Sequence, residues 1–127
     1  MIAVDTSALL AIALNELTAD ACIAAIESED EVIISAGTLT ELFVVASRRH
    51  LLDAAHQLLD RVGMTVVSVT EQTARQVGNA YDRWGRGVHP AGLNFGDCFA
   101  YAVAKEHGCP LLFVGDDFAH TDVQSVL

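Results

Sequence analysis

The sequence is poor in positive charge. It contains seven lysine and arginine residues against 17 aspartate and glutamate residues, which gives a formal net charge of −10. Proteins that grip nucleic acid through many phosphate contacts need lysine and arginine for them. The composition therefore argues against an extended basic binding surface. The acidity itself leaves three interpretations open, namely solubility, binding of divalent cations and binding of a basic partner.

Long apolar runs and paired cysteines are missing as well. No segment approaches the roughly 18 apolar residues that a membrane-spanning helix needs. The start also lacks a basic stretch followed by an apolar one, the pattern of an export signal. The cysteines Cys22, Cys98 and Cys109 include no C-x-x-C pair, which favours reduced, buried thiols. We therefore expect a cytoplasmic protein with no role at a membrane.

Apolar residues make up 52% of the 127 residues, so we expect residues 1–127 to form a single domain with a substantial core. Short apolar runs bounded by turn residues alternate with longer segments of helical periodicity. This alternation predicts a three-layer α/β fold, with a short parallel sheet of four or five strands and helices on both faces. The expected strands are 2–4, 32–35, 65–69, 111–114 and a short edge strand at 124–126. After a first helix that follows Ser7, the expected helices are about 19–28, 38–50, 52–62, 71–84 and 95–107.

An acidic residue stands where the first strand gives way to a helix. Three apolar residues precede Asp5, and Thr6 and Ser7, residue types that cap helix starts, follow it. Ligands of open α/β sheets bind at this carboxyl edge of the strands. Because burying an unpaired carboxylate is costly, Asp5 needs either hydrogen-bond donors or a cation.

Other acids are expected at the same edge. Glu41 falls in the first turn of the helix after the second strand, Asp97 opens the last helix, and Asp116 and Asp117 follow the fourth strand. Carboxylate oxygens in this number suit hard cations such as Mg²⁺ or Mn²⁺. Such a site activates water and stabilises the oxygens of an in-line phosphoryl displacement.

Most of these acids have a structural interpretation too. The pattern Thr38-x-x-Glu41 matches a capping box, Asp97 would favour a helix N-terminus through the helix dipole, and Asp116 and Asp117 are ordinary turn residues. Each of these interpretations stays open when the residue is taken alone. The joint pattern favours a site, because an acid follows each of three strands and another opens a late helix.

Several segments together resemble a known family. Residues 4–8, Glu41, residues 89–98 with their Gly-Leu-Asn-Phe-Gly-Asp run, and residues 111–118 with their Asp-Asp-Phe ending resemble a PIN domain. More narrowly, they resemble a VapC-type toxin ribonuclease of a bacterial type II toxin–antitoxin pair. The resemblance implies an endoribonuclease that depends on Mg²⁺ or Mn²⁺, is usually a homodimer, and is inhibited by a VapB-type antitoxin.

The resemblance also assigns roles to individual residues. It implies that Asp5 and Asp97 bind the metal and that Glu41 is the mid-chain acid. Many members carry an aspartate where this chain has Gly115, so Asp116 and Asp117 share the role of the fourth acid. The resemblance further implies that a hydroxyl, that of Thr6 or Ser7, helps to hold the metal or its water.

Basic residues near the glycine-rich loop are the candidates for contact with RNA. Arg83, Arg86 and His89 lie at or near this loop and could guide the phosphate backbone, although a solvated helix end explains them equally well. Two other classes of function remain open: a metal-dependent DNase of the same fold, and a non-catalytic receiver-like binding module. A receiver would need a lysine after its last strand, whereas the only lysine here, Lys105, falls inside a helix.

Overall fold

Four short strands form one parallel sheet at the centre of the chain, and the computed structural model describes all residues from 1 to 127. The order across the sheet is β3-β2-β1-β4. The expected fifth strand is reduced to a single parallel bridge between Leu111 and Ser125. The strands are β1 (Ile2–Val4), β2 (Val32–Ser35), β3 (Thr65–Val67) and β4 (Leu111–Leu112).

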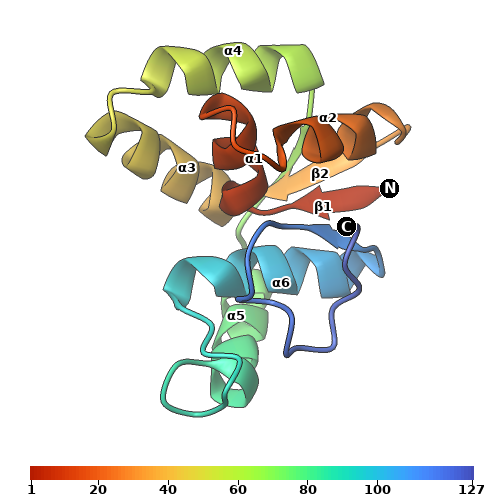
Figure 1. Cartoon of the computed structure of the whole chain (residues 1–127). Helices are drawn as coiled ribbons and strands as arrows, with labels where there is room; N and C mark the ends of the chain where they lie inside the picture. The colour runs from red at the N-terminus through yellow and green to blue at the C-terminus, as the bar shows by residue number, and fades with distance from the viewer.

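Helices cover both faces of the sheet, which confirms the predicted three-layer α/β fold (Figure 1). One layer contains α1 (Thr6–Ala13), α2 (Ala19–Glu27), α3 (Ala36–Arg48) and α4 (Leu52–Val62). The other contains α5 (Glu71–Trp84) and α6 (Phe95–His107). None of these helices combines the length and the apolar character that crossing a bilayer requires.

Strands β1, β2 and β4 are buried on both faces because neighbouring residues point into different cores, whereas Thr65 and Val66 of the edge strand β3 are exposed. Ala3, Ile33 and Leu111 pack into the cluster that includes the apolar residues of α5 and α6. The residues that follow them, Val4, Ile34 and Leu112, pack into the cluster beneath α1 to α4. This two-sided burial is what continuous apolar runs in a parallel sheet predict.

The strand order creates a crevice beside β1. The chain builds β1, β2 and β3 outward in one direction and then places β4 on the other side of β1. The carboxyl ends of β1 and β4 therefore flank the point at which the direction of strand addition reverses. Ligands of open α/β sheets bind at such switch points. Asp5 and residues 113–117 lie there by virtue of the topology.

Two predicted helix starts are wrong. The helix expected from residue 38 is α3, which begins earlier, at Ala36, because the Ser35 side chain accepts a hydrogen bond from the Gly37 N–H at 3.2 Å. Thr38 is consequently inside the helix, so the capping box with Glu41 does not form, and Glu41 lies in the second turn. At α1, Asp5 itself is the N-cap.

Two helical glycines differ in what surrounds them, which allows a matched test of packing. A Cβ at Gly37 would overlap the ring of Phe99, whereas a Cβ at Gly78 would meet no atom within 4 Å. We expect Gly37→Ala to lower the free energy of unfolding by about 1–3 kcal/mol through overpacking. Gly78→Ala should raise it by about 0.5–1 kcal/mol, because alanine favours the helix. Urea unfolding of both variants measures these changes, and equal signs would contradict the packing of α3 on α6.

Candidate active site

Asp5 is held in place by the first turn of α1. Its Oδ2 atom accepts hydrogen bonds from the backbone N–H of Ser7 at 3.0 Å and from the Ser7 hydroxyl at 2.7 Å. The same hydroxyl accepts a hydrogen bond from the backbone N–H of Val114, beyond β4, at 3.0 Å. Ser7 thereby joins the ends of β1 and β4 and fixes the orientation of the Asp5 carboxylate.

The second oxygen of Asp5 has no partner. Asp5 is 4% exposed, and its Oδ1 is buried without any hydrogen bond. Burial raises the pKa of Asp5 from 3.8 to about 6, against the hydrogen bonds from Ser7, which lower it, and with a further rise from the charge of Glu41. A buried carboxylate oxygen without a donor is costly for the fold, and a cation would remove that cost.

The side chain of Glu41, on α3, lies near the Asp5 carboxylate, whose pKa its charge raises. Its Oε1 accepts a hydrogen bond from the Thr6 hydroxyl at 2.8 Å. Its Oε2 lies against the backbone of α6 at Gly96, where a Cβ would overlap it. The side chain of Glu41 thus passes between the start of α1 and the start of α6, and the absence of a side chain at Gly96 makes room for it.

Asp97 combines the predicted helix-start role with a place among the acids. It forms a capping box with Asn94: the Asn94 N–H donates to Asp97 Oδ2 at 3.0 Å, and the Asp97 N–H donates to Asn94 Oδ1 at 2.8 Å. Burial raises the pKa of Asp97 from 3.8 to about 7, with further rises from the charges of Asp5, Asp117 and Glu41. The predicted position of Asp97 at a helix N-terminus is therefore correct, and the capping box adds a contact that was not predicted. The helix-start role is incomplete, since the charges of three other acids also raise the pKa of this carboxylate.

Both candidates for the fourth acid lie in the turn after β4. Asp116 and Asp117 are both exposed, and Asp117, rather than Asp116, is among the charges that raise the pKa of Asp97. Gly115 before them has a φ of 100°, a conformation that favours glycine. This turn favours Asp117 as the nearer acid.

The residues present fit a hard divalent cation. Their donor set consists of carboxylate oxygens, and one of these, Asp5 Oδ1, is buried without a partner. No three of the acidic, histidine or cysteine side chains are grouped closely enough to ligate one ion together. Mg²⁺ does not require such a group, because it usually keeps several waters and takes only one or two carboxylates directly. Asp5 and Asp97 would hold the ion, with Glu41 and Asp117 reaching it directly or through water.

Comparison with known proteins agrees with this geometry. The PIN-domain family model matches residues 2–124. The chain belongs to the PIN-domain family. The VapC ribonuclease Mb0640 of Mycobacterium bovis is 39% identical over 126 residues, which cover 97% of this chain and 96% of that protein. This identity over nearly the full length relates the chain to the VapC ribonucleases within the family, as its sequence motifs predict.

Solved structures show the same fold. The crystal structure of Mycobacterium tuberculosis VapC20, described as a toxin that cleaves the sarcin–ricin loop, has a TM-score of 0.80 at 22% identity and covers 99% of this chain and 98% of its own. A toxin–antitoxin complex from Klebsiella pneumoniae contains a chain with a TM-score of 0.70 at 18% identity, covering 96% of this chain and 93% of that one. At these identities the likeness concerns the fold.

The two hydroxyl residues of this PIN domain hold its acids. Thr6 donates to Glu41 and Ser7 donates to Asp5, at 2.8 and 2.7 Å. Each hydroxyl therefore has an acidic partner within the chain, so its direct effect is to orient a carboxylate. Whether either also contacts a metal or its water remains a prediction from the family resemblance.

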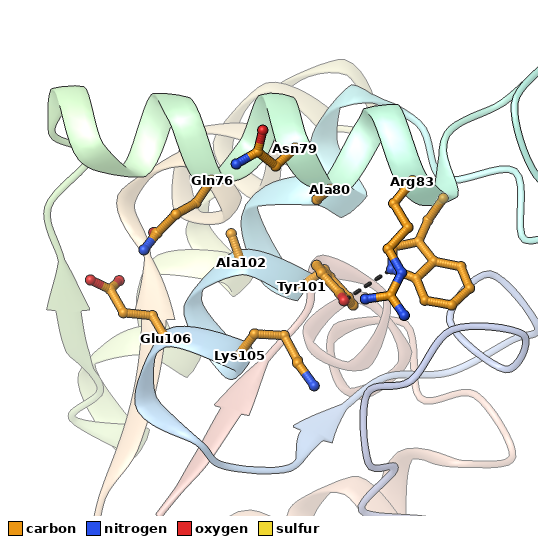
Figure 2. A pocket seen from close by; sticks show the side chains of 9 residues that line it. Gln76, Asn79, Ala80, Arg83, Tyr101, Ala102, Lys105 and Glu106 are labelled. Atoms are coloured by element: carbon orange, nitrogen blue, oxygen red, sulfur yellow. Dashed lines mark hydrogen bonds between the residues drawn. The ribbon is translucent and has the colours of Figure 1, made fainter.

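The three residues predicted to guide RNA differ in the contacts that their side chains already make within the chain. Arg83 lies over the Trp84 ring, 4.5 Å from its centroid, and pairs with Asp122 at 3.5 Å. Figure 2 shows it at one end of the pocket between α5 and α6, beside the hydrogen bond between Trp84 and Tyr101. The Nδ1 of His89 accepts a hydrogen bond from the Ala91 N–H at 3.0 Å, within its own loop. Arg86 is exposed and forms no ion pair.

Two residues that shape the site were not predicted as site residues. Asn94 caps α6 and so positions Asp97, and Gly96 leaves the space that the Glu41 carboxylate occupies. Asn94 carries a local signal, because asparagine before a helix is a favoured N-cap. Gly96 carries a weaker one, because glycine is unfavourable inside a helix while its contact with α3 is visible only in the folded chain.

The raised pKa of Asp97 predicts a pH-dependent stability of the metal-free protein. A carboxylate with a raised folded pKa stabilises the fold fully below its unfolded pKa, and this contribution is lost as the pH rises through the folded value. For Asp97 that window runs from about 4 to about 7. Asp5 adds a similar contribution, which is lost as the pH rises through its folded pKa of about 6. The free energy of unfolding in EDTA should therefore fall by about 2–4 kcal/mol between pH 5 and pH 8, since one pKa unit corresponds to about 1.4 kcal/mol.

Urea unfolding at the two pH values measures this fall, and Asp97→Asn should reduce it. Asp122 provides a control of opposite sign, because hydrogen bonding from Tyr101, aided by Lys105, lowers its pKa. Its contribution is fully present above its unfolded pKa, so Asp122→Asn should cost stability equally at pH 5 and pH 8. A fall of unchanged size in Asp97→Asn would show that burial and the neighbouring acids do not raise the pKa of Asp97 in the folded protein.

Proposed function

We propose that this PIN domain is an endoribonuclease that uses Mg²⁺, or Mn²⁺ in its place, bound by Asp5 and Asp97. The observation that carries the proposal is the partnerless, buried Oδ1 of Asp5 at the sheet edge where the acids of α3 and α6 also arrive. The relationship to VapC ribonucleases supports RNA as the substrate. It also supports the role of toxin in a type II toxin–antitoxin pair.

The chain's own residues prepare the reaction. A divalent ion in this place would lower the pKa of a bound water and offset the charge of the phosphodiester. Ser7 occupies Oδ2 of Asp5 and leaves Oδ1 for the ion. Thr6 occupies Oε1 of Glu41, so Oε2 is the atom we assign to accept the proton of the attacking water. As the water oxygen bonds to phosphorus, the P–O bond to the ester oxygen opposite it breaks, and that leaving oxygen takes a proton from solvent.

The partners belong to the same proposal. We expect a VapB-type antitoxin to inhibit the enzyme, as the relationship to VapC toxins and the likeness to the fold of a toxin–antitoxin complex suggest. A homodimer is also expected, and the exposed apolar side chain of Val44 on α3 is consistent with such an interface. The receiver-like alternative loses its support, because Lys105 pairs with Asp122 at 3.3 Å instead of facing the acids.

Cleavage assays test the proposal. A labelled single-stranded RNA is incubated with the purified protein in Mg²⁺, in Mn²⁺ and in EDTA, beside a DNA strand of the same sequence. We expect RNA cleavage with either ion, none in EDTA, and no cleavage of the DNA. RNA cleavage that persists undiminished in EDTA would contradict the metal assignment. Preferential cleavage of the DNA strand would instead support the alternative of a metal-dependent DNase.

A further inference from the structure

A groove of about 580 Å³ lies between α5 and the start of α6. Its lining is largely apolar and also includes Arg86 and Asn94. It is separate from the pocket of Figure 2, which is lined by other residues of the same two helices. The acids described above do not line it.

Two exposed aromatic rings line the groove. Phe95, the first residue of α6, is 74% exposed, and Tyr81 of α5 is 41% exposed. Both are held in position: the Phe95 ring packs nearly perpendicular to Phe99 at 5.1 Å, and the Tyr81 hydroxyl donates to the Arg86 carbonyl at 3.2 Å. Fixed, exposed aromatic rings are the surfaces on which proteins stack unpaired nucleobases.

Gly78 keeps the groove open. It lies in the middle of α5, where glycine is less favourable than alanine. A Cβ at this position would meet no atom within 4 Å, so close packing does not explain the glycine. Its missing side chain instead leaves free space along the exposed face of the helix, beside Tyr81.

The groove adjoins Asp97, because Asn94, Phe95 and Cys98 at the start of α6 all line it. Asn94 lines the groove and also forms both hydrogen bonds of the capping box with Asp97, at 2.8 and 3.0 Å. A ligand in the groove would therefore lie next to the helix turn that carries Asp97. Arg86 adds a positive charge that no acid of the chain neutralises by an ion pair, and such a charge suits a phosphate.

We propose that this groove binds one unpaired nucleobase of the RNA, close to the phosphodiester that is cleaved. Phe95 and Tyr81 stack the base, and Arg86 contacts an adjoining phosphate. The proposal rests on the ribonuclease function proposed above and adds the substrate class, RNA that is single-stranded or has a base turned out of a loop. The groove's volume of about 580 Å³ lies within the range of about 300–1,000 Å³ that is typical of sites for small ligands, and a nucleobase is of that kind.

Kinetics with abasic substrates test the proposal. Single-stranded RNAs in which one nucleotide near the cleavage site lacks its base are compared with the intact RNA. At one of these positions, loss of the base should raise the KM of the wild type about 5- to 100-fold. The same abasic RNA should cost Phe95→Ala little, because the stacking partner is already gone. Phe95→Ala should itself raise the KM for intact RNA, and Phe95→Trp should restore it.

Two further variants sharpen the test. Gly78→Leu fills the groove from α5 and should weaken cleavage of intact RNA like Phe95→Ala. Val88→Ala removes an apolar side chain of the neighbouring loop that is 56% exposed and does not line the groove, and it should leave the KM for intact RNA unchanged. Melting curves confirm that each variant is folded, as expected for changes at exposed positions.

The outcomes separate this proposal from the proposed function. If the wild type cleaves no RNA at all, the ribonuclease assignment itself fails. If it cleaves RNA and Phe95→Ala cleaves intact and abasic RNA as the wild type does, the base-binding groove alone is refuted. If Phe95→Ala loses activity equally on both RNAs and sedimentation shows a dimer becoming a monomer, the groove is an interface between two copies and the proposal is overturned.

Discussion

Replacing Asp97 with asparagine should reduce RNA cleavage by at least about 100-fold while the fold survives. Asparagine has nearly the same shape, and its side-chain oxygen can still accept the hydrogen bond from the Asn94 N–H that closes the start of α6. What it removes is the negative charge and the anionic ligand for the ion. Losses of 100-fold or more are typical when one group that stabilises the reacting centre is removed.

The measurement is kcat/KM on a defined RNA, together with a melting curve for each protein. Asp53→Asn is the matched control, because Asp53 also lies in the first turn of a helix, α4, yet is exposed and is not among the charges that affect Asp5 or Asp97. It should cleave RNA as the wild type does. Full Mg²⁺-dependent activity in Asp97→Asn would remove this residue from the active site.

A single methyl group at Gly96 should impair the enzyme through Glu41. The Cβ of alanine would occupy the place of Glu41 Oε2, so the flexible glutamate side chain must move, and its hydrogen bond from Thr6 at 2.8 Å would be disturbed. We expect Gly96→Ala to lower kcat/KM about 10- to 100-fold, the range reported for losing an oriented group beside a metal. Stability should change little, because the carboxylate can turn away and alanine favours the helix.

A double-mutant cycle decides whether the effect passes through Glu41. If it does, Gly96→Ala should have almost no further effect in a Glu41→Ala background, because the group that it displaces is already missing. Equal losses in both backgrounds would show that the methyl group acts on α6 itself. They would leave Glu41 without a demonstrated role in the site.

The sequence predicts well the strands, helices and topology that position this site. Strands β1, β2 and β4 appear as short apolar runs because both of their faces are buried. Helices α4, α5 and α6 have the expected bounds because Gly63, Gly85 and Gly108 follow their last residues. Parallel topology then brings Asp5 and the residues after β4 to one edge. These features depend on local patterns and on general rules of connection.

The errors and gaps arise where the answer depends on a distant partner. Thr38 and Glu41 fit a capping box by spacing, but Ser35, the last residue of a buried strand, caps α3 instead. Arg83 is basic and near the loop, but its pairing with Asp122 is set by how the C-terminal segment folds back. Gly96 and Glu41 contact each other although they are 55 positions apart in the sequence, so no local pattern predicts the contact.

The central claim is that the acids converge on one divalent ion, and four melting curves test it most directly: wild type and Asp5→Asn, each in EDTA and in Mg²⁺ at pH 7.5. In EDTA, Asp5→Asn should melt higher than the wild type, because it removes a buried charge whose pKa is raised to about 6. Mg²⁺ should raise the melting temperature of the wild type by several degrees through binding to the folded state, about 2.7 kcal/mol at 100 times the Kd, and that of the variant much less. If Asp5→Asn instead melts lower in EDTA and Mg²⁺ shifts both proteins equally, Asp5 is a hydrogen-bonded structural acid and the ion site is wrong.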